Sequence, residues 1–224
     1  MDAVVFDWDG TLVDTLGALY EANLVVMREL GLPFDRALYR RHFAPDWRLM
    51  YRRLGVPDER LEEANEIWMT AYDRGIASQL FDGVTESLDR LATAGRRLGL
   101  VTAGDREVVE PQLERLGIAD RFEARVFGDD LPVHKPNPAP LRRALELLGI
   151  GDRPSGAAYV GDVPDDMRMA RSVGAHGVGI VSALGEADAL LAAGATEIAG
   201  SVSEWVDRTL GIMRVDRSPG VPAI

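Results

Sequence analysis

Short apolar runs alternate with longer amphipathic segments along most of the chain. The runs that we expect to form strands are residues 3–6, 98–101, 125–127, 157–160 and 177–181. The segments between the later runs have the spacing of helices, and they are residues 84–94, 106–116, 138–148 and 165–173. Near-continuous apolar strands that alternate with helices are typical of a parallel sheet covered on both faces. The pattern therefore predicts an α/β fold.

One long segment interrupts this alternation. From about residue 16 to residue 79, stretches such as "ALYEANLVVMREL" and "RLEEANEIWMTAYDRGI" have helical periodicity and no strand-like run. We expect residues 16–79 to form an all-helical cap inserted after the first strand, with residues 1–15 and 80–211 as the core. Helices inserted beyond the end of a strand can cover a site there. Residues 212–224 are expected to form a loosely ordered tail.

Composition and charge exclude several classes of protein. The 36 acidic residues exceed the 25 basic ones and give a net charge of -11, which disfavours binding to nucleic acid or to an anionic membrane. The chain has no cysteine, so disulfides, thiolate nucleophiles and cysteine-based zinc sites are excluded. We find no signal-peptide pattern and no membrane span, and we expect a cytoplasmic protein. A small anionic substrate remains compatible, because a metal ion can reverse the field in one cleft.

Polar side chains follow three of the expected strands. Asp7, Thr102 and Asp162 each end an apolar run, and ligands of open parallel sheets bind beyond the carboxyl ends of the strands. Any one of these residues alone would be an ordinary turn residue or helix cap, but together they indicate one cleft. Asp7 and Asp162 are hard oxygen ligands that suit Mg²⁺, and an aspartate beside that ion can attack phosphorus. Asp9 is then placed to give and take a proton.

Four stretches together resemble a known family. In chain order they are "DWDGTLVD", "LVTAG", "HKPNPAPLRRALELLG" and "YVGDVPDDMRMARSVG", and they are similar to the four motifs of haloacid dehalogenase superfamily hydrolases. The resemblance spans about residues 3–181 and is strongest to the phosphoglycolate phosphatase-like branch. The stretch "DTLGALYEANLVVMRELGLP" resembles the first cap helix of that branch. It implies a Rossmann-like core with a helical cap, a Mg²⁺-dependent phosphatase activity and a small phosphorylated metabolite as substrate. The oligomeric state stays open.

The resemblance also implies a role for each catalytic residue. Asp7 would be the nucleophile and a metal ligand, and Asp162 would be a further metal ligand. Asp9 would be the acid and base, and its backbone carbonyl would also bind the metal. Thr102 would donate its hydroxyl to the phosphoryl group. Lys135 would balance the negative charge on the phosphoryl group and on the nucleophile.

Other residues are expected to surround this set. Asp166 would lie behind Asp162 or behind Lys135. The residues that we expect to contact the substrate's phosphoryl group are Gly10, Thr11, Ala103 and Gly104. In the cap, we expect one or two side chains of the stretch "RHFAPDWRLMYRRLG" to reach the substrate, and the candidates are Arg41, His42, Trp47, Arg48 and Arg52.

Three other functions compete with the phosphatase. A sugar-phosphate mutase of the β-phosphoglucomutase kind shares the core motifs, but it typically carries a histidine early in the cap where this chain has Leu19. A 2-haloacid dehalogenase needs neither an acid two residues after its nucleophile nor magnesium, so Asp9 argues against it. A non-catalytic protein that binds phosphorylated ligands would be expected to have lost a catalytic carboxylate, and none is missing. A phosphatase acting on a phosphoglycolate-like phosphomonoester is the leading hypothesis.

Overall fold

A six-stranded parallel sheet lies at the centre of the computed structural model, which describes residues 1–75 and 78–211. The strand order is β3-β2-β1-β4-β5-β6. The strands are β1 (Ala3–Phe6), β2 (Arg97–Val101), β3 (Ala124–Val126), β4 (Ala157–Gly161), β5 (His176–Ile180) and β6 (Glu197–Ala199). Strand β1 lies between β2 and β4 and pairs with both in parallel. The predicted α/β fold is confirmed.

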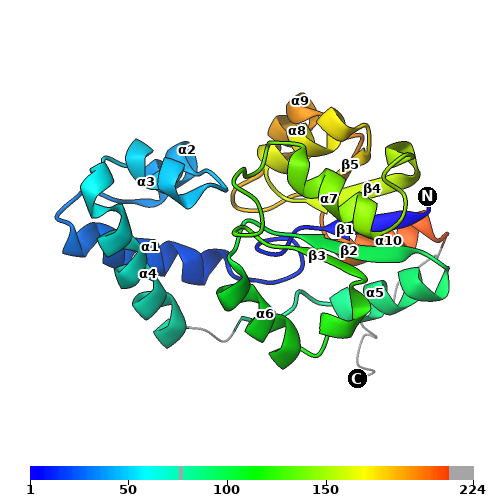
Figure 1. The fold of residues 1–224 in the computed structure, drawn as a ribbon, viewed down its shortest axis with the longest axis horizontal. Helices are drawn as coiled ribbons and strands as arrows, with labels where there is room; N and C mark the ends of the chain where they lie inside the picture. The colour runs from blue at the N-terminus through cyan, green and yellow to red at the C-terminus, as the bar shows by residue number, and fades with distance from the viewer. Residues whose placement is uncertain (76–77, 212–224) are drawn as a thin grey trace, which may run out of the picture.

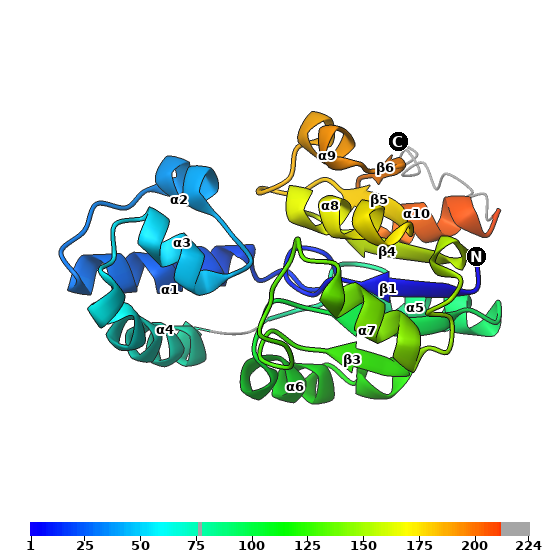
Figure 2. The same cartoon turned by 45° about the horizontal axis from the view of Figure 1, so that its top comes forward.

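Helices cover both faces of the sheet (Figures 1 and 2). One face carries α5 (Val84–Thr93), α6 (Arg106–Arg115) and α10 (Val202–Thr209), and the other carries α7 (Ala139–Leu147), α8 (Pro164–Val173) and α9 (Ala187–Ala193). In β1, Val4 and Phe6 pack on the first group of helices, whereas Ala3 and Val5 pack on the second. This burial on both faces explains why the run is apolar at every position.

Helices α1 (Leu16–Glu29), α2 (Arg36–His42), α3 (Trp47–Arg53) and α4 (Leu61–Gly75) lie beyond the carboxyl ends of the strands (Figures 1 and 2). They pack around an apolar cluster of their own, which includes Val26, Met27, Tyr51 and Ala64. Short 3₁₀ turns complete the described elements, and they are η1 (Asp58–Arg60), η2 (Ala119–Arg121) and η3 (Pro154–Gly156). These four helices are therefore in a position to cover whatever the strand ends present.

The sequence pattern missed the last three elements of the fold. Strand β6 is a three-residue edge strand with exposed Glu197, and α9 is a short helix rich in alanine, so neither has a clear periodic signal. Helix α10 did carry one, because Val202, Trp205 and Val206 share one buried face at helical spacing. Strands β3 and β5 each end one residue earlier than predicted.

Two further expectations concern membrane-spanning helices and the C-terminal tail. No helix among residues 1–75 and 78–211 combines the length and the apolar character that a membrane span requires. The tail predicted at residues 212–224 lies outside the described residues.

Candidate active site

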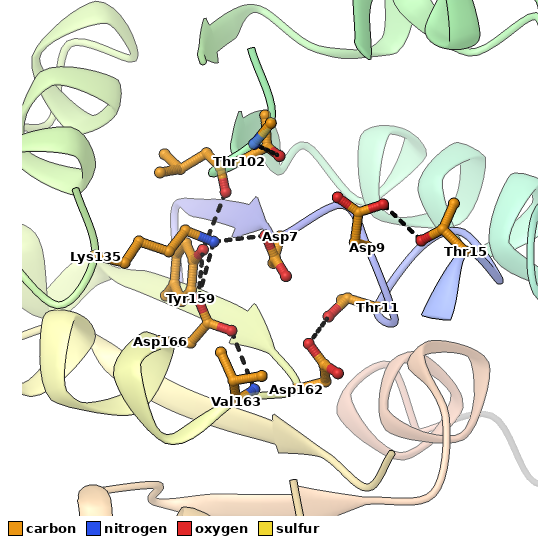
Figure 3. A network of polar contacts seen from close by, with 12 residues as sticks. Asp7, Asp9, Thr11, Thr15, Thr102, Lys135, Tyr159, Asp162, Val163 and Asp166 are labelled. Carbon is orange, nitrogen blue, oxygen red and sulfur yellow. Dashed lines mark hydrogen bonds and ion pairs between the residues drawn. The ribbon is translucent and has the colours of Figure 1, made fainter. Parts of the chain in front are cut away.

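Three adjacent strands deliver the polar side chains that the sequence singled out (Figure 3). Asp7 follows β1, Thr102 follows β2 and Asp162 follows β4, and β1 lies between the other two strands. All three side chains are buried. One carboxylate oxygen from each of Asp7, Asp162 and Asp166 lies within 4.8 Å of the others. The sheet thus concentrates negative charge at one edge.

Lys135 provides the positive charge next to this cluster. Its Nζ lies 2.5 Å from Oδ1 of Asp7 and 2.9 Å from Oδ1 of Asp166. It is the only lysine in the chain, and it is buried in the loop that precedes α7. Burial by itself would lower the pKa of Lys135, but the attraction of Asp166 and Asp7 outweighs burial and raises it. The side chain is therefore a charged ammonium that holds two carboxylates in fixed orientations.

Asp166 is occupied by partners inside the protein. Besides Lys135, its Oδ1 accepts a hydrogen bond from the hydroxyl of Tyr159 at 3.1 Å, and its Oδ2 accepts one from the N–H of Val163 at 3.2 Å. A Cβ at Gly161 would lie 2.4 Å from Oδ2 of Asp166, so only glycine leaves room for this carboxylate. Of the two expected places for Asp166, the geometry favours the one behind Lys135. Tyr159, inside an apolar strand, gave no signal in the sequence.

Asp162 is held by two hydroxyl groups. Ser182 donates to Oδ2 of Asp162 at 2.6 Å, and Thr11 donates to Oδ1 at 3.4 Å. A Cβ at Gly10 would lie 2.5 Å from Oδ2, so glycine is needed there as well. Ser182 was missed in the sequence, although it follows β5 by two residues and the rule that selected Thr102 would have found it.

The cluster of carboxylates has too little positive charge around it. Burial raises the pKa of Asp7 to about 7 even though Lys135 opposes the change. Burial, together with repulsion from Asp7 and Asp166, also raises the pKa of Asp162 well above its ordinary value. A divalent cation would remove this repulsion, and Mg²⁺ prefers a few carboxylate oxygens. Asp7 and Asp162 therefore fit a site for a divalent cation by charge, burial and donor type.

Asp9 points away from Lys135, toward the start of α1 (Figure 3). The hydroxyl of Thr15 donates to Oδ1 of Asp9 at 2.5 Å. Burial raises the pKa of Asp9, and the bond from Thr15 acts against that rise. Thr15 stands at the N-cap of α1 but its side chain makes no cap hydrogen bond, so its hydroxyl serves the carboxylate instead. Asp9 is thus more easily protonated than an exposed aspartate.

The remaining predicted residues divide between two cavities. Ala103 and Gly104 line the cavity that contains the acids, whereas Gly10 and Thr11 line a neighbouring one. Thr102 is buried beside the first cavity, and its Oγ1 accepts a hydrogen bond from the N–H of Gly104 at 3.0 Å. Because that bond uses the oxygen as an acceptor, the hydroxyl hydrogen of Thr102 is available to another group.

The cavity that contains the acids measures about 150 Å³, and residues of α1, α2, α3 and α4 line its far side. Of the five cap residues expected to be candidates, Trp47 lines it. The cations Arg41, His42, Arg48 and Arg52 are not among the residues that line it. The guanidinium of Arg52 lies 2.6 Å from Asp58, and that of Arg48 lies 3.3 Å from Glu62.

Known proteins resemble the chain in sequence and in fold. Residues 4–180 match the sequence profile of the family described as haloacid dehalogenase-like hydrolase. The phosphoglycolate phosphatase of Nitrosococcus oceani is 36% identical over 181 residues, which is 76% of this chain and 80% of that protein. The phosphoglycolate phosphatase of Chromobacterium violaceum is 31% identical over 216 residues, 92% of this chain and 95% of that protein.

The solved structures agree on the fold. A hydrolase from Pseudomonas syringae superposes with a TM-score of 0.83 at 23% identity and covers 95% of this chain and 99% of its own. At this identity the likeness concerns the fold alone. Together with the match along the sequence, it confirms the resemblance that the four stretches indicated.

Binding of a divalent cation at Asp7 and Asp162 can be tested without a substrate. Adding Mg²⁺ to metal-free protein should raise the thermal unfolding temperature by about 5–10 °C at about a hundred times the dissociation constant. The rise should be larger at about pH 8 than at about pH 6, because Asp7, with a pKa of about 7, must lose its proton before it can bind a cation. Circular dichroism during heating measures both values.

Two variants control this measurement. Asp162→Asn should remove most of the rise, since it takes away one charged ligand, whereas Asp82→Asn changes an exposed carboxylate elsewhere and should keep the full rise. An equal rise at both pH values, or a full rise in Asp162→Asn, would contradict the assignment of the cation to Asp7 and Asp162.

Proposed function

The chain belongs to the haloacid dehalogenase-like hydrolases and is a phosphatase of that family, and we propose that it hydrolyses a small phosphomonoester through a phosphorylated Asp7. The observation that carries this proposal is the position of Asp7 at the end of the central strand. Its carboxylate lies 2.5 Å from the ammonium of Lys135 and next to Asp162, in a cavity that the cap helices line on one side. Such a carboxylate is oriented, dehydrated and paired with a cation before any substrate arrives.

In the first step, an oxygen of Asp7 forms a bond to phosphorus while the bond from phosphorus to the ester oxygen breaks. The leaving oxygen takes a proton from Asp9. Burial raises the pKa of Asp9, which suits a group that must hold a proton before the reaction. Lys135 stays charged beside Asp7 and stabilises the negative charge of the phosphoryl group.

In the second step, water attacks the phosphorus of the phosphorylated Asp7. Asp9, now ionised, takes the proton from that water, and the bond between Asp7 and phosphorus breaks to release phosphate. Thr15 stays within hydrogen-bond distance of Asp9 and keeps its carboxyl group directed into the cavity. The same residue thus serves both half-reactions with opposite proton transfers.

Mg²⁺ is the proposed cofactor, held by the carboxylates of Asp7 and Asp162 and by the backbone carbonyl of Asp9. When bound, it would supply positive charge against the phosphoryl oxygens. Ser182 and Thr11 fix the orientation of Asp162 through their hydroxyl groups.

The other proposed contacts concern the substrate. Thr102 would give its hydroxyl hydrogen to the phosphoryl group, and Ala103 and Gly104 would offer backbone N–H groups from the loop that lines the cavity. Gly10 and Thr11 are proposed to approach the phosphoryl group from the neighbouring loop. Residues 16–79 are proposed to act as a cap domain that excludes water while the ester bond breaks.

Hydrolysis is favoured over transfer to a sugar by the side chain of Leu19. It lines the cavity from helix α1, where the related mutases typically carry a histidine. No histidine lines this cavity in residues 1–75 and 78–211. A sugar hydroxyl would therefore lack the imidazole that prepares it to accept the phosphoryl group, and water is the remaining acceptor.

The role of Asp7 can be tested by removing its charge. Asp7→Asn preserves the shape of the side chain but should lower phosphate release from any substrate by at least about a thousandfold, because an amide is a poor nucleophile. Rapid acid quenching of the unchanged enzyme during turnover, followed by peptide mass spectrometry, should place the phosphoryl group on Asp7.

The control variant for this test is Asp82→Asn, whose carboxylate is exposed and outside the cavity. It should keep the activity of the unchanged enzyme. A phosphoryl group trapped on any other residue, or near-normal turnover by Asp7→Asn, would remove Asp7 from the role of nucleophile.

The choice between water and a sugar as acceptor can be tested with β-glucose 1-phosphate. We expect free phosphate to be the main phosphorylated product, since the cavity presents Leu19 and no imidazole. Anion-exchange chromatography separates phosphate from glucose 6-phosphate. Efficient formation of glucose 6-phosphate with little free phosphate would favour the mutase instead.

A further inference from the structure

The wall of the cavity opposite the acids is built from one face of each cap helix. In α4, the side chains that line it are Asn65, Trp68, Met69 and Tyr72, which are spaced by three, four and seven positions and so share one face. The rings of Trp68 and Tyr72 stack with their centroids 4.5 Å apart. Three of these four side chains are therefore aromatic or apolar, and Asn65 adds one amide.

The neighbouring helices continue this surface. Trp47, Met50 and Tyr51 of α3 line the cavity at spacings of three and four, and the rings of Trp47 and Tyr51 meet edge to face at 5.9 Å. Leu16 and Leu19 of α1 contribute aliphatic side chains. Tyr39 of α2 also lines the cavity, and we call this surface, made of the lining residues of α1, α2, α3 and α4, the aromatic wall.

The aromatic wall has no cation to pair with an acidic substrate group. Within the described part of the chain, the only cation that lines the cavity is Lys135, and Asp7 and Asp166 already hold its ammonium. Arg48 lies outside the lining, with its guanidinium 3.3 Å from Glu62 and 4.1 Å from the centroid of the Trp47 ring. A carboxylate on the leaving group of the substrate would lose its water there without gaining an ion pair.

The field at the aromatic wall also disfavours negative charge. Burial raises the pKa of the hydroxyls of Tyr39 and Tyr72, and the charge of Asp9 raises both further. The same charge would repel a carboxylate placed beside these rings, and the faces of aromatic rings are themselves electronegative. The wall therefore selects for a neutral group.

Two buried polar atoms on the aromatic wall lack a hydrogen-bond partner among the described residues. The side-chain N–H of Asn23 donates to the carbonyl of Leu19 at 2.7 Å, which fixes the orientation of the amide. Its Oδ1 is buried and has no hydrogen-bond partner among the described residues. An amide oxygen only accepts, so the missing partner is a donor. The hydroxyl of Tyr51 is likewise buried without a partner.

We propose that the leaving group of the substrate is an uncharged aromatic alcohol that carries a hydrogen-bond donor on its ring, with the ring on the aromatic wall and the donor on Asn23. This inference rests on the proposed function of the same site. The cap side of this cavity is lined by rings and aliphatic side chains, against which an aromatic ring can pack. The leaving alcohol of phosphoglycolate is glycolate, which is small and carries a carboxylate, so phosphoglycolate is a poor match to these surroundings.

Four primary alkyl phosphates test the proposal, because they share the same kind of ester bond. They are benzyl phosphate, 3-hydroxybenzyl phosphate, 3-carboxybenzyl phosphate and phosphoglycolate. We expect kcat/KM to be highest for 3-hydroxybenzyl phosphate and at least about tenfold lower for phosphoglycolate, since one buried aromatic ring contributes that much. For 3-carboxybenzyl phosphate, kcat/KM should be close to the value for phosphoglycolate, because the carboxylate cancels most of the favourable contribution of the ring.

Two variants test which cap side chains contribute to the choice of substrate. Asn23→Leu removes the unpaired acceptor at similar volume, and it should lower kcat/KM for 3-hydroxybenzyl phosphate by about tenfold while changing benzyl phosphate little. Arg48→Gln removes a cap cation that does not line the cavity, and the order of the four kcat/KM values should stay the same. Selective loss of phosphoglycolate hydrolysis in Arg48→Gln would show that this cation serves an acidic substrate.

Binding of the leaving alcohols provides a measurement that needs no turnover. The intrinsic fluorescence of the unmodified protein should change on addition of 3-hydroxybenzyl alcohol, since Trp47 and Trp68 line the cavity, and it should stay constant on addition of glycolate. Asn23→Leu should weaken the binding of this alcohol about tenfold.

The outcomes keep the two proposals apart. If none of the four esters releases phosphate but 3-hydroxybenzyl alcohol binds, the proposed function fails and the aromatic wall is a binding site for such an alcohol. If phosphate is released fastest from phosphoglycolate, or if the aromatic alcohol does not bind, the phosphatase stands and the aromatic leaving group is refuted.

Discussion

The ammonium of Lys135 forms two ion pairs, one with Asp7 and one with Asp166, and the candidate active site depends on them. A parallel sheet places Asp7 and Asp162 at adjacent strand ends, and Asp166 follows in the next helix, so the fold itself buries three carboxylates together. Loss of one partner from such a buried group typically costs about 3–5 kcal/mol, because the remaining charges lose their compensation. One lysine therefore permits the arrangement, and it still leaves a deficit of positive charge that suits a divalent cation.

The core and the cap divide the site between two kinds of surface. The core side presents charge that is fixed by strand ends, whereas the cap side presents rings and aliphatic side chains from several helices. Exclusion of water by the apolar side strengthens every electrostatic interaction on the polar side. In the proposed function the two surfaces have separate roles: the core would act on the phosphoryl group, and the cap would select the alcohol that leaves.

Most of the core could be predicted from the sequence, because buried parallel strands and polar strand ends have strong local signals. Asp7 and Asp162 were predicted for the same reason, whereas Lys135 lies in a loop and was predicted only from the resemblance of its stretch to a family motif. The hydrogen bond from Thr15 to Asp9 was not predicted, because it depends on how the N-cap residue of α1 is placed relative to Asp9 in the folded chain. The aromatic wall was also missed, since an apolar stripe on a helix looks the same whether it meets other helices or a cavity. Tertiary packing alone separates these two cases.

Because Lys135 is the only lysine, its charge can be observed directly. Protein labelled with ¹³C at the ε carbon of lysine should give a single lysine signal, and its chemical shift can be followed as the pH rises. The account predicts that the signal titrates above the ordinary pKa of 10.5 or stays charged until the fold is lost, since Asp166 and Asp7 stabilise the ammonium. In Asp7→Asn the titration should move to lower pH. Titration of Lys135 at or below its ordinary pKa in the unchanged protein would contradict the account.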